Sequence, residues 1–161
     1  MEIITYGNEI LASEAEPVRV IDKAAMKLAA DLVETMIAGK GIGLAAPQVG
    51  VSKRLFVVQI ADDIPRVFFN PKIVQASEDT GKFEEGCLSL PGIYADVTRP
   101  SAIRVHAINE KGKPFTLDAE GLLARVIQHE LDHLFGIMFV DRLTEFKRKR
   151  ILKAWEEKTR A

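Results

Sequence analysis

The order in which the hydrophobic period changes along the chain is the feature that most limits its fold. Apolar residues recur at helical spacing from 22 to 38, and Gly39 is a natural stop for that helix. Helical spacing returns at about 120–134 and again from about 144 to the end. Between them lie strand-like runs rich in β-branched and aromatic residues, namely RLFVVQI (54–60), RVFFNPKIV (66–74), SAIRVHAI (101–108) and KPFTLDA (113–119).

Short connections limit how these strands can pair. They are too short to hold crossover helices, so neighbouring strands are expected to be antiparallel. Helices at the two ends with strands between them favour an α+β fold over alternating βαβ units. We expect mixed, mainly antiparallel sheets around the central helix at 120–134, with one helix before them and one after. No repeat or linker divides the 161 residues, so we expect a single domain over 1–161.

Composition excludes several classes of protein. The net charge is -1, from 22 basic and 23 acidic residues, so no global field attracts nucleic acid or an anionic membrane. No apolar run approaches the ~20 residues that span a bilayer. The first residues, MEIITYGNEI, resemble neither a secretory signal nor a transit peptide. We therefore expect a cytoplasmic monomer with no DNA or membrane partner.

The hexapeptide QHELDH at 128–133 indicates a catalytic metal site on the central helix. His129 and His133 lie four residues apart, so on a helix both imidazoles can reach one divalent cation, while Glu130 reaches a bound water. The spacing of Leu122 and Val126 puts both histidines on the stripe that faces the sheet. A catalytic site of this kind usually takes three protein ligands. One ligand is therefore missing from the hexapeptide.

The residues leave several candidates for that third ligand. Asp141 and Glu145 lie downstream, as a zinc protease would require, but nothing in their spacing distinguishes them. His106 lies in a strand-like run, where a partly exposed strand residue is the commoner interpretation. Cys87, the only cysteine, lies in the tight segment EEGCLSLPG and is either a small buried side chain or chemically active. A thiolate with two imidazoles would suit Zn(II) or Fe(II).

Three segments together resemble a known family. GIGLAAPQ, EGCLS and QHELDH, in this order and at these separations, are similar to the signature motifs of the peptide deformylases, and the resemblance extends over essentially the whole chain. GIGLAAPQVG lacks the Lys-Ser/Thr end of a P-loop, so nucleotide binding is set aside. The resemblance implies a mixed α+β fold and an N-formylmethionyl peptide substrate. The implied reaction removes the formyl group from nascent polypeptides and releases formate.

The resemblance also assigns roles to individual residues. It implies one divalent metal, usually Fe(II) with Zn(II) or Ni(II) as alternatives, held by Cys87, His129 and His133. Glu130 would take the proton of the metal-activated water and pass it to the leaving amine. The Gln48 side chain and the Leu88 backbone N–H would donate to the oxyanion. For Gln48, a surface glutamine after a turn is the simpler alternative.

Substrate-binding residues follow from the same resemblance. Those expected to line the methionine pocket or to pair with an extended peptide are Ile42, Gly43, Glu85, Gly86, Leu122 and Val126. Tyr94 departs from the family pattern, because many bacterial members carry an arginine there, near the outer end of the cleft. The outer subsite is therefore expected to differ in this chain.

The final helix carries a basic run whose residues are Lys147, Arg148, Lys149 and Arg150. The simplest interpretation is a solvated helix face. A transient contact with ribosomal RNA is the alternative hypothesis. Two rival functions for the whole chain are a zinc endopeptidase with a downstream ligand and a metal-bound structural or ribosome-associated protein without catalysis.

Overall fold

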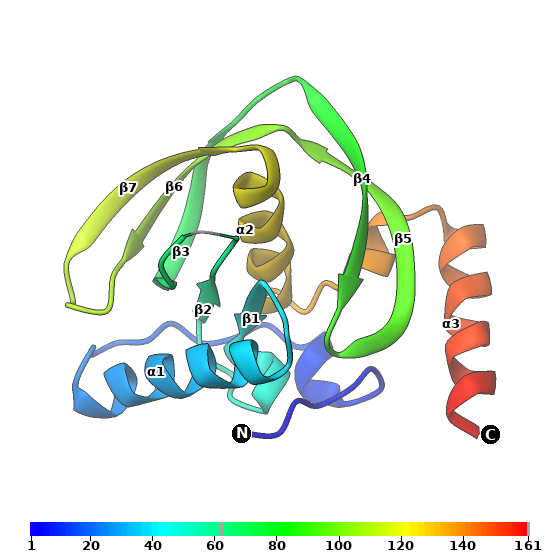
Figure 1. Ribbon diagram of the computed structural model, residues 1–161, viewed down its shortest axis with the longest axis horizontal. Coiled ribbons are helices and arrows are strands. Elements are labelled where there is room, and N and C mark those ends of the chain that lie inside the picture. Colours follow the sequence, from blue (N-terminus) through cyan, green and yellow to red (C-terminus); the bar gives the residue numbers. More distant parts are fainter. Residues whose placement is uncertain (62, 161) are drawn as a thin grey trace.

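Helix α2 (Gly121–Leu134) runs through the centre of the molecule, and both sheets pack around it (Figure 1). The computed structural model describes residues 1–61 and 63–160. Helix α1 (Lys23–Ala38) covers one face of the larger sheet, and helix α3 (Glu145–Arg160) lies against the smaller one. The expected α+β fold is confirmed. In the sequence, α1 precedes the strands and α3 follows them, and helix α2 lies at the centre of the molecule.

The strands form two separate sheets. Their bounds are β1 (Gly43–Ala45), β2 (Leu55–Val58), β3 (Arg66–Ala76), β4 (Thr80–Cys87), β5 (Leu90–Pro100), β6 (Ala102–Ile108) and β7 (Pro114–Glu120). The larger sheet has the order β1-β2-β3-β6-β7, and β4 and β5 form the smaller sheet. Each of these pairings is antiparallel, as the short connections predict. Short 3-10 helices lie at η1 (Glu9–Ala12), η2 (Ala46–Val49) and η3 (Phe139–Arg142).

The ends of helix α1 are set by local chemistry. The Asp22 side chain accepts a hydrogen bond of 3.0 Å from the Ala25 N–H and caps the first turn. The helix ends at Ala38, as predicted, but Gly39 has φ -82° and is not left-handed. The left-handed residue is Lys40, at φ 58°. The left-handed turn after the helix therefore falls at Lys40, one residue later than a glycine stop at position 39 would place it.

Strands β4 and β5 are long strands that the sequence pattern does not predict. Strand β4 reads TGKFEEGC and has almost no apolar alternation, while β5 contains Pro91, Gly92 and Pro100. They pair with one another from Thr80–Pro100 to Cys87–Leu90. Their pairing places Cys87 at the last position of β4, directly before the turn into β5.

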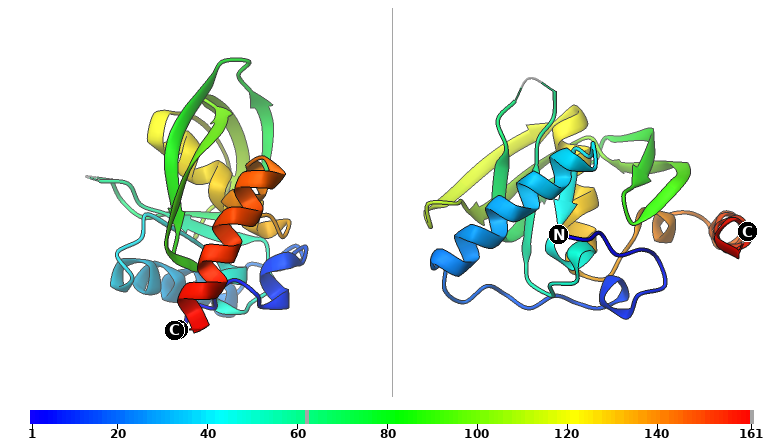
Figure 2. Two further views of the ribbon diagram at one scale, coloured as in Figure 1. Left: turned by 90° about the vertical axis from the view of Figure 1, so that its right-hand side faces the viewer. Right: turned by 60° about the horizontal axis from the view of Figure 1, so that its bottom comes forward.

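Apolar residues form a cluster on each side of the larger sheet and a third one beneath the smaller sheet. In the third cluster, Leu152 and Trp155 of α3 pack with Leu90 and Val97 of β5. Figure 2 shows α3 beside the β4-β5 hairpin, away from the larger sheet. Among the described residues, no helix is both long and apolar enough to cross a membrane.

Helix α2 buries many polar and charged side chains. Every residue from Ala124 to Leu134 except Leu131 is buried, including several that are polar or charged. Burying such groups costs free energy unless they find hydrogen-bond partners. The partners of these side chains therefore identify the candidate site.

Candidate active site and metal centre

A cavity of about 450 Å³ lies between β1, the β4-β5 hairpin and helix α2. The residues predicted to act in the site line it almost without exception, namely Ile42, Gly43, Gln48, Glu85, Gly86, Cys87, Leu88, Tyr94, Leu122, Val126, His129 and Glu130. His133 does not line the cavity, because it is fully buried behind it. Segments that are far apart in the sequence therefore converge on one cavity.

Cys87, His129 and His133 form one group of candidate ligand atoms, all within 4.8 Å of one another. The Cys87 Sγ lies 3.3 Å from the His133 Nε2. The strand end at Cys87 supplies the thiol, and successive turns of α2 supply the two imidazoles. Within residues 1–61 and 63–160, no other group of this kind is found.

The other candidates for a third ligand lie elsewhere. His106 is exposed on β6, paired across the strands with Thr116. Asp141 accepts hydrogen bonds from the Met138 N–H and from Arg148. Glu145 pairs with Lys149 on helix α3. None of these three belongs to the group formed with the two histidines.

The donor set and its surroundings fit a divalent cation. The His129 Nδ1 lies 2.9 Å from the Glu85 Oε1, which leaves Nε2 as the free nitrogen of that ring. Burial, together with the neighbouring His129, holds the pKa of His133 well below its ordinary value and keeps its imidazole neutral, as a ligand requires. A thiolate with two imidazoles is a donor set that borderline and soft divalent metals prefer.

The pKa of His129 reflects the anionic surroundings of the group. Burial lowers this pKa, but the carboxylate of Glu130 and the Cys87 thiol outweigh burial and raise it well above the ordinary value. A positive charge is therefore favoured at this point of the structure, and a bound cation would supply it.

Glu130 is buried beside the candidate ligands and faces Gly43. Burial raises the pKa of its carboxyl to about 7. Its Oε1 is buried and finds no hydrogen-bond partner among the described residues. A Cβ at position 43 would overlap the Glu130 carboxylate, so the glycine leaves the space that the carboxylate occupies.

Gln48 is buried, and its amide is fixed at both ends. The Oε1 accepts a hydrogen bond of 2.9 Å from the Ala45 N–H. The Nε2 lies 3.4 Å from the Cys87 Sγ and donates to the Ser89 Oγ at 3.2 Å. With only 1% of its surface exposed, Gln48 is not the surface glutamine that the simpler alternative supposed.

The turn that carries Leu88 packs against two glycines. A Cβ at Gly41 would lie 2.7 Å from the Leu88 Cδ1, and one at Gly39 would lie 3.3 Å from it. The loop between α1 and β1 therefore needs small residues where the Leu88 side chain docks. This contact fixes the turn that follows Cys87.

A family model described as polypeptide deformylase matches residues 1–149 of the chain. The chain belongs to the polypeptide deformylase family. Peptide deformylase of Neisseria meningitidis serogroup B is 52% identical over 153 residues, which cover 94% of this chain and 91% of that protein. Peptide deformylase 1 of Burkholderia multivorans is 47% identical and covers 100% of this chain and 90% of its own length.

A solved structure of the family agrees over the whole fold. The peptide deformylase of Ehrlichia chaffeensis, in complex with actinonin, superposes with a TM-score of 0.95 at 38% identity. The match covers 100% of this chain and 98% of that one. Membership of the deformylase family and the Cys87, His129 and His133 group together support a site for a divalent metal ion.

The structure of this deformylase family member also reveals buried polar residues that the motifs did not indicate. They are Ser89, which lies inside EGCLS but had no assigned role, and Arg99, Arg125, Gln128 and Asp132. Asp132 lies inside QHELDH, and Arg125 lies one turn before His129, so a helix buried on all sides could have indicated both. Arg99 lies in the unpredicted strand β5, and nothing in the sequence near it indicates a buried charge.

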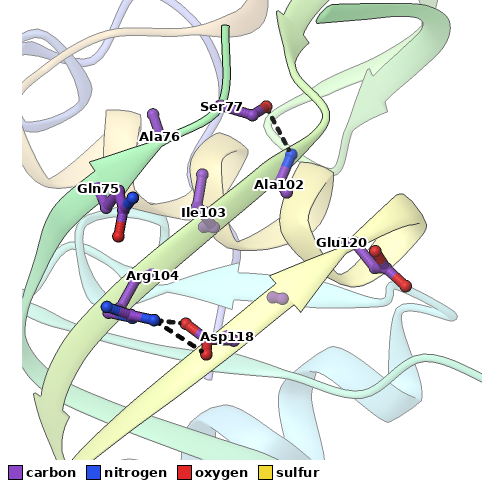
Figure 3. A pocket seen from close by; sticks show the side chains of 9 residues that line it. Gln75, Ala76, Ser77, Ala102, Ile103, Arg104, Asp118 and Glu120 are labelled. Atoms are coloured by element: carbon purple, nitrogen blue, oxygen red, sulfur yellow. Dashed lines mark hydrogen bonds and ion pairs between the residues drawn. The ribbon is translucent and has the colours of Figure 1, made fainter. Parts of the chain in front are cut away.

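A second, more open groove of about 420 Å³ crosses the outer surface of strands β3, β6 and β7 (Figure 3). Its main polar feature is the ion pair between Arg104 and Asp118, at 2.7 Å, with both side chains exposed. None of the predicted site residues of the deformylase motifs lines this groove. Arg104 and Asp118 already pair with one another and Glu120 is the one further charged residue among the described residues of the lining, so the groove has the character of ordinary sheet surface.

Proposed function

We propose that this protein removes the N-formyl group from the formyl-methionine at the start of nascent polypeptides and releases formate. One observation carries the proposal: Cys87, His129, Glu130 and Gln48 meet in one cavity, with His133 directly behind them, in a chain of the deformylase family. The cavity is lined partly by exposed side chains such as Tyr94 and Leu122, where a peptide could enter, and partly by buried groups suited to hydrolysis.

The proposed ligands of the metal are Cys87, His129 and His133. A divalent ion held by them would supply Lewis acidity that lowers the pKa of a water molecule toward neutrality. We propose Fe(II) as the native ion, with Zn(II) or Ni(II) able to replace it, because the thiolate and imidazoles accept all three. Metal analysis of protein purified without oxygen would identify the resident ion.

Glu130 is the proposed proton carrier. It accepts a proton from the attacking water and later donates it to the leaving amine, so a single carboxyl serves first as base and then as acid. Burial raises the pKa of this carboxyl, which is the direction required of a group that first accepts and then donates a proton. The space beside Gly43 keeps the carboxylate pointing into the cavity.

Gln48 and Leu88 are the proposed donors to the oxyanion that forms on the formyl group. The Gln48 Nε2 is already aimed toward the thiol end of the cavity, because Ala45 and Ser89 hold the amide. The Leu88 N–H follows Cys87 directly. Preorganised donors of this kind stabilise developing charge without reorganisation at the moment of reaction.

The peptide is proposed to bind between two strand edges. Within the part of the chain that the structure describes, β1 pairs with β2 alone and β4 with β5 alone, so each presents an unpaired edge near the cavity. An extended peptide can form backbone hydrogen bonds with such edges at Ile42, Gly43 and Gly86. Binding of this kind recognises the peptide backbone and selects weakly among the side chains that follow the methionine. The methionine side chain would lie against Leu122 and Val126.

Tyr94 is proposed to form the outer subsite. It is 63% exposed at the mouth of the cavity, and its ring lies against Gly86, where a Cβ would collide with it. Glu85 also lines the cavity, but its carboxylate faces His129 and two arginines. We therefore propose that Glu85 supports the metal ligand and contributes only its stem to the pocket wall.

A transient contact of helix α3 with ribosomal RNA remains part of the proposal, for a monomer that acts in the cytoplasm. Lys147, Lys149 and Arg150 are exposed, whereas Arg148 is partly buried and pairs with Asp141. Reversing the three exposed charges should abolish cosedimentation with ribosomes at low salt. Binding that survives the reversal would refute this contact.

The test against the protease alternative compares three peptides. Metal-loaded protein should release formate from formyl-Met-Ala-Ser, leave acetyl-Met-Ala-Ser unchanged, and cut no internal bond of a longer unformylated peptide. Cleavage of the internal bond without formate release would favour the endopeptidase. No hydrolysis of any of the three would favour a protein without catalysis.

A further inference from the structure

Glu85 holds a buried carboxylate at the centre of an ion-pair network. Its Oε1 lies 2.9 Å from the His129 Nδ1 and accepts from the Arg99 Nη2 at 2.9 Å. Its Oε2 accepts from the Arg99 Nε at 2.7 Å and from the Arg125 Nη1 at 2.6 Å. Each carboxylate oxygen therefore has two partners, and the carboxylate cannot turn without breaking a contact to an arginine.

Arg125 is itself held from three directions. It lies on α2 one turn before His129, and its guanidinium also donates to the Val97 carbonyl at 3.0 Å and to the Gly81 carbonyl at 2.7 Å. The ring of Phe83 lies 4.9 Å from the guanidinium carbon, with most of the ring exposed. One guanidinium therefore ties β4, β5 and α2 together, and an aromatic ring covers it.

Arg99 extends the network to the second histidine. Its Nη1 donates to the Asp132 Oδ2 at 2.9 Å, and Asp132 directly precedes His133. Asp132 also accepts two hydrogen bonds from Arg142, at 2.7 and 3.0 Å. The same guanidinium thus contacts the carboxylate that orients His129 and the helix turn that carries His133.

We propose that Arg99 and Arg125 are positioning residues for the metal centre, which act through Glu85 to fix the His129 ring with its Nε2 toward Cys87. This inference rests on the proposed function, because the metal belongs to it. A carboxylate with only the imidazole as partner would have unpaired lone pairs in a buried site and would draw in water or shift. Two planar, forked donors hold it at a fixed distance and angle.

The first experiment replaces Arg125 by lysine, which keeps the charge but cannot span the Glu85 oxygen and two carbonyls at once. Zn(II) affinity is measured by competition with a chelator, and Co(II) absorption reports the geometry of the thiolate and imidazole ligands. We expect a ~10- to 100-fold weaker affinity and altered Co(II) bands, as for other partners of ligating histidines. Arg104→Lys is the matched control, since Arg104 pairs only with exposed Asp118 and should leave both readouts unchanged (Figure 3).

The second experiment tests whether the arginine acts through Glu85. In a Glu85→Gln background, Arg125→Lys should weaken Zn(II) binding little further, because the contact it supports is already lost. Phe83→Ala exposes the guanidinium to water, which should loosen its ion pair with Glu85 and weaken Zn(II) binding in the same direction. If Arg125→Lys fails to fold, the Zn(II) affinity of Phe83→Ala tests the inference in its place.

Two outcomes would overturn the inference. One is Zn(II) affinity and Co(II) bands in Arg125→Lys, or Zn(II) affinity in Phe83→Ala, equal to those of the unsubstituted protein. The other is a full additional loss of affinity when Arg125→Lys is placed on Glu85→Gln. Both readouts use the metal alone, without substrate, so they are independent of whether the unsubstituted protein releases formate.

Discussion

Gly43 and Glu130 show how one missing side chain can place a catalytic group. The Glu130 carboxylate occupies the space that a Cβ at position 43 would take, and the Glu130 Cγ would lie only 2.9 Å from that Cβ. Since Glu130 is buried, it has little room to move aside. The position of the proposed proton carrier on helix α2 therefore depends on a residue of strand β1.

We expect Gly43→Ala to push the Glu130 carboxylate out of position. The turnover number should fall ~10²-fold or more, the order of a lost general acid-base step, while metal content stays unchanged. Steady-state kinetics and metal analysis of the same preparation check this. The control is Ile37→Ala near the end of helix α1, whose exposed side chain does not line the cavity. An unchanged turnover number in Gly43→Ala would contradict the assigned role of Glu130.

Gln48→Ala should remove one donor to the oxyanion. The expected loss is ~10²–10³-fold in the turnover number, with little change in KM, because the donor acts chiefly in the transition state. Ser89→Ala should give a smaller loss in the same direction, since Ser89 holds the Gln48 amide. A rise in KM without a loss of turnover would instead make Gln48 a group that binds the ground state.

For single residues, the sequence predicts those whose roles follow from a motif and misses those whose roles come from side-chain contacts in the folded protein. Cys87, His129 and Gln48 could be identified because their types and spacing carry chemistry on their own. Arg99 could not, because it becomes significant only when β4 and β5 pair and bring it beside Glu85, and Ser89, although inside EGCLS, gains a role only through its contact with Gln48. Such partners are properties of the tertiary structure.

Helix α3 packs against strand β5 and so supports the smaller sheet. The partner of β5 in that sheet is β4, which ends in Cys87. Trp155 and Leu152 are buried against Leu90 and Val97. Helix α3 otherwise has few buried residues and many charged ones. The contribution of this helix to stability should therefore come from a few large side chains.

Trp155→Ala should lower the free energy of unfolding by about 3–5 kcal/mol, the range for large-to-small changes at buried aromatic sites. Urea unfolding followed by far-UV circular dichroism measures the change. Phe146→Ala on the same helix is the control, because that ring is 75% exposed and its loss should change stability by less than about 0.5 kcal/mol. Equal effects of the two substitutions would mean that α3 does not pack as described.

Elements with a strong period were predictable, and the β4-β5 hairpin was not. Helices α1 and α2 begin and end within a residue or so of the expected bounds, since capping and periodicity are local. Strand β5 contains prolines and a glycine that usually interrupt strands, and β4, with the sequence TGKFEEGC, has few apolar residues and no apolar alternation. Their strand structure comes from pairing with each other and from packing on α2 and α3.

For the whole molecule, we propose that residues 1–161 fold as a single domain. Helix α2 contacts strands of both sheets, and the ion pairs of Arg99 and Arg125 join the smaller sheet to that helix. A molecule connected in this way should unfold cooperatively, since neither sheet keeps its buried face without α2.

Metal-loaded protein should therefore show one unfolding transition. Fluorescence of Trp155, which lies beneath the smaller sheet, and far-UV circular dichroism, which reports all helices and strands, should give coincident midpoints in urea. Two separated midpoints would show that the β4-β5 and α3 part unfolds on its own and would refute the single-domain proposal.

The central claim is that the centre formed by Cys87, His129 and His133 removes formyl groups. The most direct measurement is formate release from formyl-Met-Ala-Ser by protein prepared anaerobically with Fe(II), beside Cys87→Ala prepared in the same way, with the metal content of both. We predict that the unsubstituted protein retains Fe(II) and releases formate, and that Cys87→Ala loses both metal and activity. No formate from the Fe(II)-loaded protein, or full metal and activity in Cys87→Ala, would contradict the claim.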